Sequence, residues 1–69
     1  MLWLVLKNAS HNIISCNTFK EGDKHQLWVT RPNGKNLMIL ESTDENEITT
    51  AKNAIDYAIE QKETALRLA

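Results

Sequence analysis

The sequence predicts an α+β domain, with an antiparallel sheet of three or four strands and one C-terminal helix packed on one face. Runs of strand-favouring residues fill residues 1–41, a hairpin turn separates two of these runs, and apolar residues recur at helical spacing over residues 48–68. A chain of 69 residues is long enough for one small domain. We therefore expect residues 1–69 to form a single unit, with strands over 1–41 and the helix over 48–68.

The clearest local signal is a β-hairpin over residues 25–40. Residues 27–29 and 37–40 are short runs of strand-favouring side chains, and residues 31–35 between them read Arg-Pro-Asn-Gly-Lys. Proline presets φ at the second turn position, and glycine adopts the left-handed conformation that closes a short hairpin through a bulge. The sequence therefore predicts a tight turn at Pro32, Asn33 and Gly34.

Both faces of this hairpin carry apolar side chains. The pleat of a strand divides its residues into two sets. The sets are Leu27 and Val29 against Gln26, Trp28 and Thr30 in the first strand, and Leu37 and Ile39 against Met38 and Leu40 in the second. We expect the helix to cover one face and a different contact to cover the other.

Two further strands are expected before the hairpin. Residues 2–6 are apolar on both faces, which is typical of a central strand. After a turn over residues 8–11, residues 12–19 form a second strand, the least distinct of the four. Residues 20–24 are charged and contain glycine, which indicates a loop leading into the hairpin.

The C-terminal third predicts one amphipathic helix. Thr49 or Thr50 is the preferred N-cap, although Ser42-x-x-Glu45 also fits a capping box and permits an earlier start. The expected apolar stripe consists of Ile48, Ala51, Ile55, Ala58, Ile59 and Leu66. Such a helix is longer than strands of five or six residues, so its last turns should extend past the sheet. There, Ala65, Leu66 and Leu68 either fray or dock on a second chain.

Charge is unevenly distributed along the chain. Residues 1–40 hold five basic and two acidic residues, whereas residues 41–69 hold three basic and seven acidic ones, for a net charge of −1. A polyanion should therefore approach the strand half, although the whole chain lacks the strongly basic balance of most nucleic-acid-binding domains.

Compartment and association follow from length and cysteine usage. The single cysteine, Cys16, cannot form an internal disulfide, and we expect it to be a buried small hydrophobe in a reducing compartment. The apolar run over residues 1–6 is too short for a signal-peptide core or a membrane span. We therefore expect a cytoplasmic protein without membrane contact. A core this small supplies little stability, so self-association, most simply as a homodimer, is also expected.

No catalytic, cofactor-binding or metal site is predicted, and we do not expect an enzyme. The soft metal ligands are His11, Cys16 and His25, and their spacing matches no zinc pattern. With two glycines the chain has no glycine-rich phosphate loop. The acidic cluster at residues 44–47 is expected to be solvated and to favour a helix start.

One constellation can carry recognition. Trp28 and Thr30 share a sheet face, and basic residues follow in the turn. The candidate binding surface is Trp28, Thr30, Arg31, Lys35, Trp3 and Lys7. Either the tryptophans complete the core or a dimer interface, or Trp28 stacks on bases while lysine and arginine neutralise phosphates.

The region from Trp28 to Ile55 resembles the arm-type DNA-binding domains at the N-terminus of phage tyrosine recombinases. The resemblance consists of an aromatic strand residue, a basic turn and an alanine-containing helix start. The matching residues are Trp28, Pro32, Gly34, Lys35, Thr49, Ala51 and Ala54. It implies a sheet that lies in the major groove, with DNA contacts from Trp28, Arg31 and Lys35. The sequence departs from this pattern at residues 37–40, which carry no basic residue.

The same region is also similar to the YegP-like small proteins. The shared features are an Asn-Gly turn, a serine after the following strand, and Ala-x-x-x-Ile in the helix. In this chain they are Asn33, Gly34, Ser42, Ala51 and Ile55. This resemblance implies a compact, self-associating unit with no established activity.

Two functions are therefore expected. The first is a small non-catalytic interaction module with a regulatory or accessory role, acting as a homodimer or on a protein partner. The alternative is a DNA- or RNA-binding accessory protein that uses the sheet face around Trp28, Arg31 and Lys35.

Overall fold

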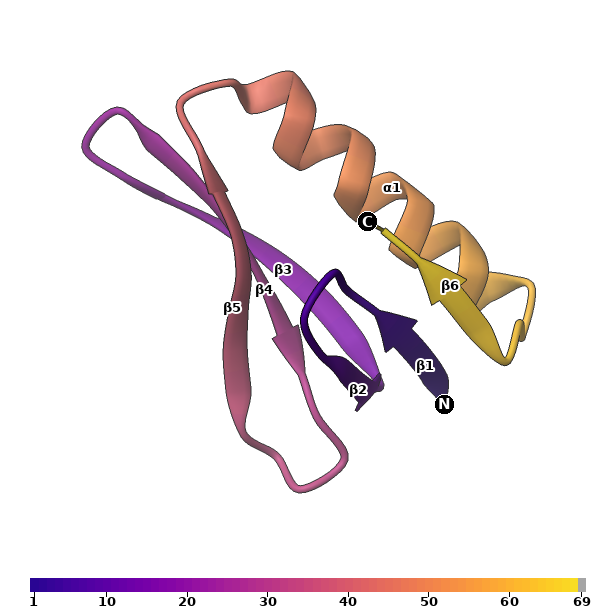
Figure 1. Ribbon diagram of the computed structural model, residues 1–69. Coiled ribbons are helices and arrows are strands. Elements are labelled where there is room, and N and C mark those ends of the chain that lie inside the picture. Colours follow the sequence, from indigo (N-terminus) through magenta and orange to yellow (C-terminus); the bar gives the residue numbers. More distant parts are fainter. Residues whose placement is uncertain (69) are drawn as a thin grey trace.

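The computed structural model describes residues 1–68 and shows two small sheets and one helix (Figure 1). In chain order the elements are β1 (Leu2–Val5), β2 (Ser10–Ile13), β3 (Ser15–Glu21), β4 (Lys24–Thr30), β5 (Asn36–Ser42), α1 (Glu45–Glu60) and β6 (Ala65–Arg67). The strands form two three-stranded sheets, in the orders β2-β1-β6 and β3-β4-β5. Helix α1 packs across β3, β4 and β5 and also touches β6. The predicted α+β class is confirmed.

A bend at Ile14 joins the two sheets. The single strand predicted over residues 12–19 is wrong, because β2 ends at Ile13 and β3 begins at Ser15. Both Ile13 and Cys16 are buried, although alternation would put residues three apart on opposite faces. The bend resolves this conflict: the Ile14 N–H donates to the Thr30 carbonyl at 2.9 Å, and the chain turns from one sheet into the other.

The loop between β1 and β2 is shorter than predicted. A turn was expected over residues 8–11, but Ser10 and His11 already pair with Val5 and Leu4. The Leu6 N–H donates to the Ala9 carbonyl at 2.8 Å, which closes the loop and lets the ladder begin at Ser10.

Of the two predicted connections beside β4, one is confirmed and the other is shorter than predicted. The predicted turn over residues 31–35 is confirmed, with Gly34 at φ +84° and its N–H bonded to the Arg31 carbonyl at 2.9 Å. The loop predicted over residues 20–24 is instead a two-residue turn, since Glu21 already pairs with Lys24. Gly22, at φ +62°, occupies the first turn position, where tight hairpin turns require positive φ.

A β-bulge in β5 changes the predicted alternation. Trp28 pairs with Met38 but Leu27 pairs with Leu40, so Ile39 is an extra residue in β5. As a result Leu40 joins Ile39 and Leu37 against the core, whereas the sequence placed Leu40 with Met38. Met38 stays on the opposite face.

Helix α1 begins earlier and ends earlier than predicted. Its N-cap is Asp44, whose side chain accepts from the Asn46 N–H at 2.9 Å, and neither Thr49 nor Thr50 caps it. Glu45 is the first helical residue, so the helix starts before Thr49, but the Ser42-x-x-Glu45 capping box does not form because Asp44, and not Ser42, is the N-cap. The helix ends at Glu60, and Lys62 has a positive φ of 56° in the turn that follows.

The C-terminal segment forms a strand and not the last turns of the helix. Strand β6 pairs in parallel with β1, matching Leu66 to Leu4. Leu66 and Leu68 pack against the core, and Ala65 is exposed within the ladder, so these residues neither fray nor extend past the sheet. Polar residues at 60–64 interrupt the helical stripe, and pairing with β1 gives Leu66 a better burial than a free helix end.

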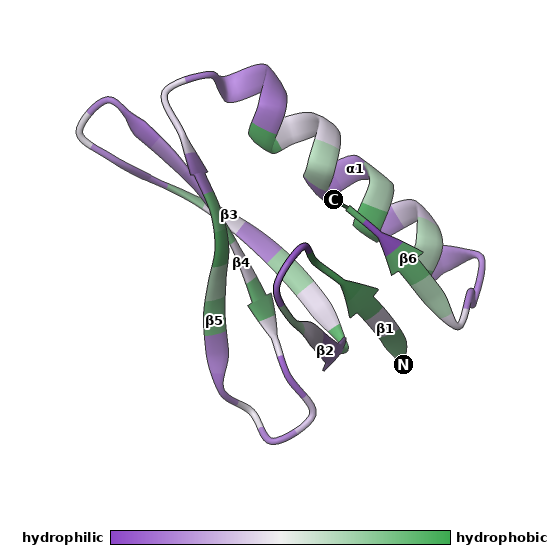
Figure 2. Ribbon diagram, in the orientation of Figure 1, coloured by the Kyte–Doolittle hydropathy of each residue, from purple (hydrophilic) through white to green (hydrophobic). Residues whose placement is uncertain are grey.

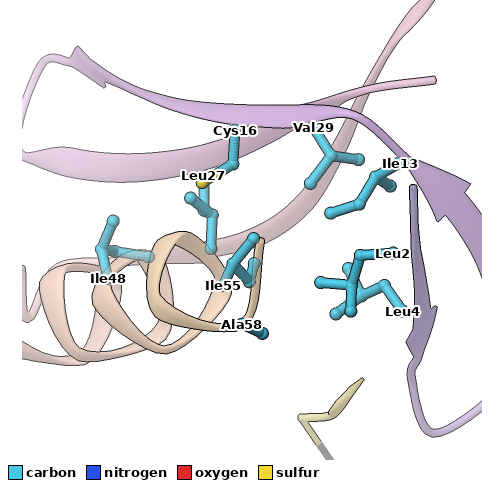
Figure 3. Close-up of a cluster of buried hydrophobic side chains, with 9 residues drawn as sticks. All are labelled: Leu2, Leu4, Ile13, Cys16, Leu27, Val29, Ile48, Ile55 and Ala58. Carbon is cyan, nitrogen blue, oxygen red and sulfur yellow. The ribbon is translucent and has the colours of Figure 1, made fainter. Parts of the chain in front are cut away.

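The core lies between α1 and the inner faces of the two sheets (Figure 3). Strands β1 to β4 and helix α1 each contribute one to three side chains that are almost fully buried, whereas β5 and β6 add partly buried ones. They are Leu2, Leu4, Ile13, Cys16, Leu27, Val29, Ile48, Ile55 and Ala58. Ala51 and Ile59, also predicted for the helical stripe, are partly buried beside it.

The core makes a direct prediction for the helix. Ile55 is 0% exposed, so Ile55→Ala should lower the free energy of unfolding by about 2–5 kcal/mol, and Ile55→Val by about 0.5–1.5 kcal/mol. Tyr57→Ala, at a helix position that is 60% exposed, should change it by no more than about 0.5 kcal/mol. Urea unfolding followed by circular dichroism measures all three. Equal losses at Ile55 and Tyr57 would contradict the packing of α1.

Candidate functional site

The face of the β3–β4–β5 sheet turned away from α1, here called the outer face, carries three large apolar side chains. Phe19 is 61% exposed, Met38 is 40% exposed, and Trp28 is half-buried between them. Trp28 pairs directly with Met38 in the ladder. The rings of Phe19 and Trp28 meet edge to face, with their centroids 6.3 Å apart and an interplanar angle of 86°. The three side chains therefore form a continuous apolar strip across the sheet.

A polar cluster holds the strip in place. Gln26 is only 8% exposed, and its amide nitrogen donates to Glu41 at 2.8 Å and to Glu21 at 3.4 Å. Its amide oxygen accepts from the indole N–H of Trp28 at 3.0 Å. Lys24 lies 3.8 Å from Glu41 at the edge of the cluster. Because both ends of the Gln26 amide are bonded, the orientation of the Trp28 ring is constrained.

The electrostatic character of the outer face differs from the basic surface expected from sequence. Two carboxylates, Glu21 and Glu41, stand beside the apolar strip, with Lys24 as their neighbouring cation. Arg31 and Lys35 lie in the turn at the far end of the β4–β5 hairpin. Trp28 and the two cations of the turn therefore belong to the same hairpin. The charged groups that contact Gln26, which binds Trp28, are nevertheless the carboxylates of Glu21 and Glu41.

The six predicted site residues divide between two sheets. Trp28 and Thr30 are on β4, and Thr30 donates from its hydroxyl to Asn36 at 2.8 Å. Arg31 is half-buried, and its Nε atom is buried without a hydrogen-bond partner among the described residues. Trp3, 42% exposed, belongs to β1 in the other sheet, and Lys7 lies in the β1–β2 loop. The structure therefore gathers four of the six on the β4–β5 hairpin.

Sequence reasoning missed the residues that complete the outer face. Phe19 falls at the end of the strand predicted over residues 12–19, but nothing in the sequence showed that it would meet Trp28. Glu21, Gln26 and Glu41 come from three different strands, and only the register of β3–β4–β5 brings them together. A cross-strand signal of this kind is not visible in a single segment.

A groove runs along the open side of β5. It encloses about 560 Å³ between β5, α1 and the β1–β2 loop. Its apolar lining includes Leu6, Ile39, Leu40, Ala51, Ala54 and Leu68. Figure 2 shows the hydrophobic middle of β5 at this place, in contrast with the hydrophilic tip of the β3–β4 hairpin. The two alanines leave the hollow because their side chains are too small to fill it.

The buried Cys16 forms a small cluster with two partly exposed side chains of α1, Lys52 and Asp56. Its thiol lies 3.2 Å from a carboxylate oxygen of Asp56, whose other oxygen is paired with Lys52. Burial, together with the hydrogen bond and negative charge of Asp56, raises the pKa of Cys16 to about 12. The thiol is therefore protonated near neutral pH and has little nucleophilic character.

The pKa of Asp56 moves in the opposite direction. Partial burial tends to raise it, but hydrogen bonds from Lys52 and Cys16 outweigh burial and hold the pKa below its usual value of 3.8. This interaction therefore stabilises the fold above pH 3.8, and the stabilisation is lost as the pH falls through the lower folded pKa.

Two structural features bear on other kinds of site. Within residues 1–68, no three His, Cys, Asp or Glu side chains gather in a group that could hold a metal ion. The helix in this part of the chain does not combine the length and the apolar character that membrane crossing requires.

The Cys16 cluster predicts a slow thiol. Raising the pKa from 9.0 to about 12 lowers the thiolate fraction at pH 8 about a thousandfold, so iodoacetamide should label the folded protein at least a hundredfold more slowly than the urea-unfolded chain. Asp56→Ala removes the hydrogen bond and the charge and should speed labelling. Glu60→Ala, at the end of the same helix, is the control and should leave the rate unchanged. Equal rates in the folded and unfolded chains would refute the cluster.

Comparisons with known proteins assign the chain to no family. No protein-family model matches it, and no match was found among curated proteins or among solved structures. The resemblances to arm-type DNA-binding domains and to YegP-like proteins stay predictions from the sequence. The function must therefore be argued from the geometry of the outer face.

Proposed function

We propose that this chain is a small non-catalytic interaction module that binds a protein partner through the outer face of the β3–β4–β5 sheet. One observation carries the proposal: Phe19, Trp28 and Met38 form an exposed apolar strip beside a fully bonded polar cluster. Aromatic residues and methionine are enriched in the centres of protein interfaces, which polar groups surround.

The strip is preorganised for binding. The indole of Trp28 is held by Gln26, which is itself held by Glu21 and Glu41. A partner that covers Trp28 therefore does not have to immobilise its ring, and the entropic cost of binding falls. The half-buried Trp28 side chain also stays partly accessible between two more exposed neighbours, Phe19 and Met38.

Charge favours a protein over a polyanion. Glu21 and Glu41 would lie close to any phosphate chain that crossed the apolar strip, and like charges repel. The same carboxylates suit a partner that presents apolar side chains flanked by lysine, arginine or amide groups. The expected contact is therefore an apolar centre with a weakly acidic margin on this chain.

Nucleic-acid binding is the second candidate. The observation that favours it is the pair of cationic side chains, Arg31 and Lys35, in the hairpin turn between β4 and β5. A strand of nucleic acid that contacted only the turn could bind these cations and avoid the carboxylates. The two candidates use adjacent parts of one hairpin and can be separated by mutation.

The first test identifies the partner and then measures binding. A photo-crosslinking amino acid at Met38 should join the chain to a specific protein in the native cell, whereas the same group at the exposed Tyr57 of α1 should not. The purified partner should then bind Phe19→Ala and Trp28→Ala variants at least tenfold more weakly than the wild type, as expected for residues at the centre of an interface. Equal crosslinking from Met38 and Tyr57 would count against the outer face.

The second test addresses nucleic acid. Tryptophan fluorescence is followed while mixed-sequence duplex and single-stranded oligonucleotides are added at low and at physiological salt. Under the protein-binding proposal we expect no quenching. Quenching that weakens as salt rises, and that is abolished by Arg31→Glu together with Lys35→Glu, would support the alternative instead. Lys62→Glu together with Arg67→Glu, two exposed positions outside the hairpin, applies the same change in net charge and is the control.

A further inference from the structure

Strand β3 is an edge strand, and all of its residues are exposed except Cys16, which is buried against α1. It is the end strand of the order β3-β4-β5, so one edge pairs with β4 and the other has no partner strand among the described residues. The two-residue turn after Glu21 makes Glu21 and Lys24 the hydrogen-bonded pair that closes the hairpin. Because such pairs alternate in an antiparallel ladder, the backbone groups of Cys16, Thr18 and Lys20 point to the free edge.

This edge has no bulge, and Lys20 is the one charged side chain that it carries on the helix side. Its register with β4 is unbroken over seven residues, from Ser15 to Glu21. Every residue of β3 except Cys16 is exposed, including Thr18 on the helix side, so α1 does not cover the edge. By contrast, β5 is interrupted by the bulge at Ile39, and β6 has only three residues. An open, regular edge strand is a template for pairing with another strand.

We propose that two copies of this chain pair through β3, antiparallel and two-fold symmetric about Thr18. This inference rests on the proposed function, because it names a second copy as one partner of the interaction module. In this register Thr18 lies opposite Thr18 of the second copy, and Cys16 lies opposite Lys20 of the second copy. All free-edge backbone groups of both strands then find partners.

Neighbouring registers satisfy fewer of these requirements. A shift of the symmetry axis by one residue, to Asn17 or Phe19, pairs only two of the three free-edge residues of each strand, so it forms four hydrogen bonds in place of six. A shift of two residues to Lys20 brings two lysines face to face, which is unfavourable. A shift of two residues to Cys16 carries the pairing into the bend at Ile14. The Thr18 axis is the register that the strand itself favours.

The side chains agree with this register on both faces of the sheet. On the outer face Phe19 lies opposite Asn17 of the second copy, and the two Phe19 rings become diagonal neighbours within aromatic reach. The apolar strip of each copy then continues into the other across a six-stranded sheet. On the helix side Lys20 faces Cys16 of the second copy, whose thiol lies 3.2 Å from the Asp56 carboxylate. A cation of one copy therefore approaches an anion of the other.

The contact is expected to be weak. Pairing of one strand of seven residues lies at the low end of interface size, so we expect a dissociation constant in the micromolar range or weaker. Two copies on one partner would still gain from joint binding through the merged outer face. Self-association can therefore be measured on the purified chain, without the protein partner.

The test places charges on the symmetry axis. Thr18 lies opposite itself, so Thr18→Lys and Thr18→Glu should each weaken self-association at least tenfold through repulsion of like charges. An equimolar mixture of the two variants should recover a dimer of one copy of each. Sedimentation equilibrium over a range of concentrations measures all four samples, including the wild type. Thr18 is exposed, so both variants should fold, and circular dichroism with urea unfolding checks this.

A matched control uses the other long edge strand. Asn36→Pro removes a backbone N–H at the start of β5 and should leave self-association unchanged. Hydrogen exchange gives a second readout, since the amides of Thr18 and Lys20 should become protected as the concentration rises. A wild-type chain that stays monomeric at millimolar concentration, a mixture that fails to recover the dimer, or loss of the dimer in Asn36→Pro would each overturn the proposal.

The outcome is separable from that of the proposed function. The Thr18 variants keep Phe19, Trp28 and Met38, so they should still bind the protein partner as monomers. Failure of self-association with intact partner binding would refute only the β3 pairing. Self-association with no effect of Phe19→Ala or Trp28→Ala on partner binding would refute only the outer-face proposal.

Discussion

The structure depends on one constraint, which is that a single helix must complete a core shared by two small sheets. Ile13 and Cys16 lie on either side of the bend at Ile14, and both reach this core. A straight strand would turn one of them outward. The bend therefore lets the β2-β1-β6 sheet fold over the same apolar cluster that α1 and the β3-β4-β5 sheet enclose (Figure 3).

In this arrangement some apolar side chains are buried in the core and others stay exposed on the outer face. Leu2, Leu4, Leu27 and Val29 face inward, and α1 adds Ile55 from the other side. Helix α1 covers the inner face, and within residues 1–68 no second helix covers the outer face, where Phe19 and Met38 are exposed. An exposed strip of this kind is costly for an isolated chain and useful for one that binds partners.

Hydrogen bonds between polar side chains fix the arrangement of the outer face. The buried amide of Gln26 joins carboxylates on β3 and β5 to the indole of Trp28 on β4. Each hydrogen bond alone contributes little to the stability of the fold. Together the bonds link β3, β4 and β5 through one side chain, and both the oxygen and the nitrogen of the Gln26 amide have partners. The same strands end in an open edge at β3, so recognition of a partner and pairing with a second copy would involve one continuous sheet.

The sequence by itself determined the features that depend on neighbouring residues. The α+β class, the turn at Pro32 and Gly34, and the shared face of Leu27 and Val29 follow from local propensity and alternation. Trp28 was identified as part of the candidate site for the same reason.

Only the tertiary structure decided the remaining features of the fold and of the outer face, because each of them depends on contacts between distant segments. Pairing with β1 drew Leu66 out of the helical stripe, and shared burial of Ile13 and Cys16 divided one expected strand into two. The bulge at Ile39 turned Leu40 inward, and the register of three strands placed Phe19, Gln26 and Glu41 around Trp28. Local patterns specify which residues favour a strand, whereas burial and cross-strand register decide which strands meet.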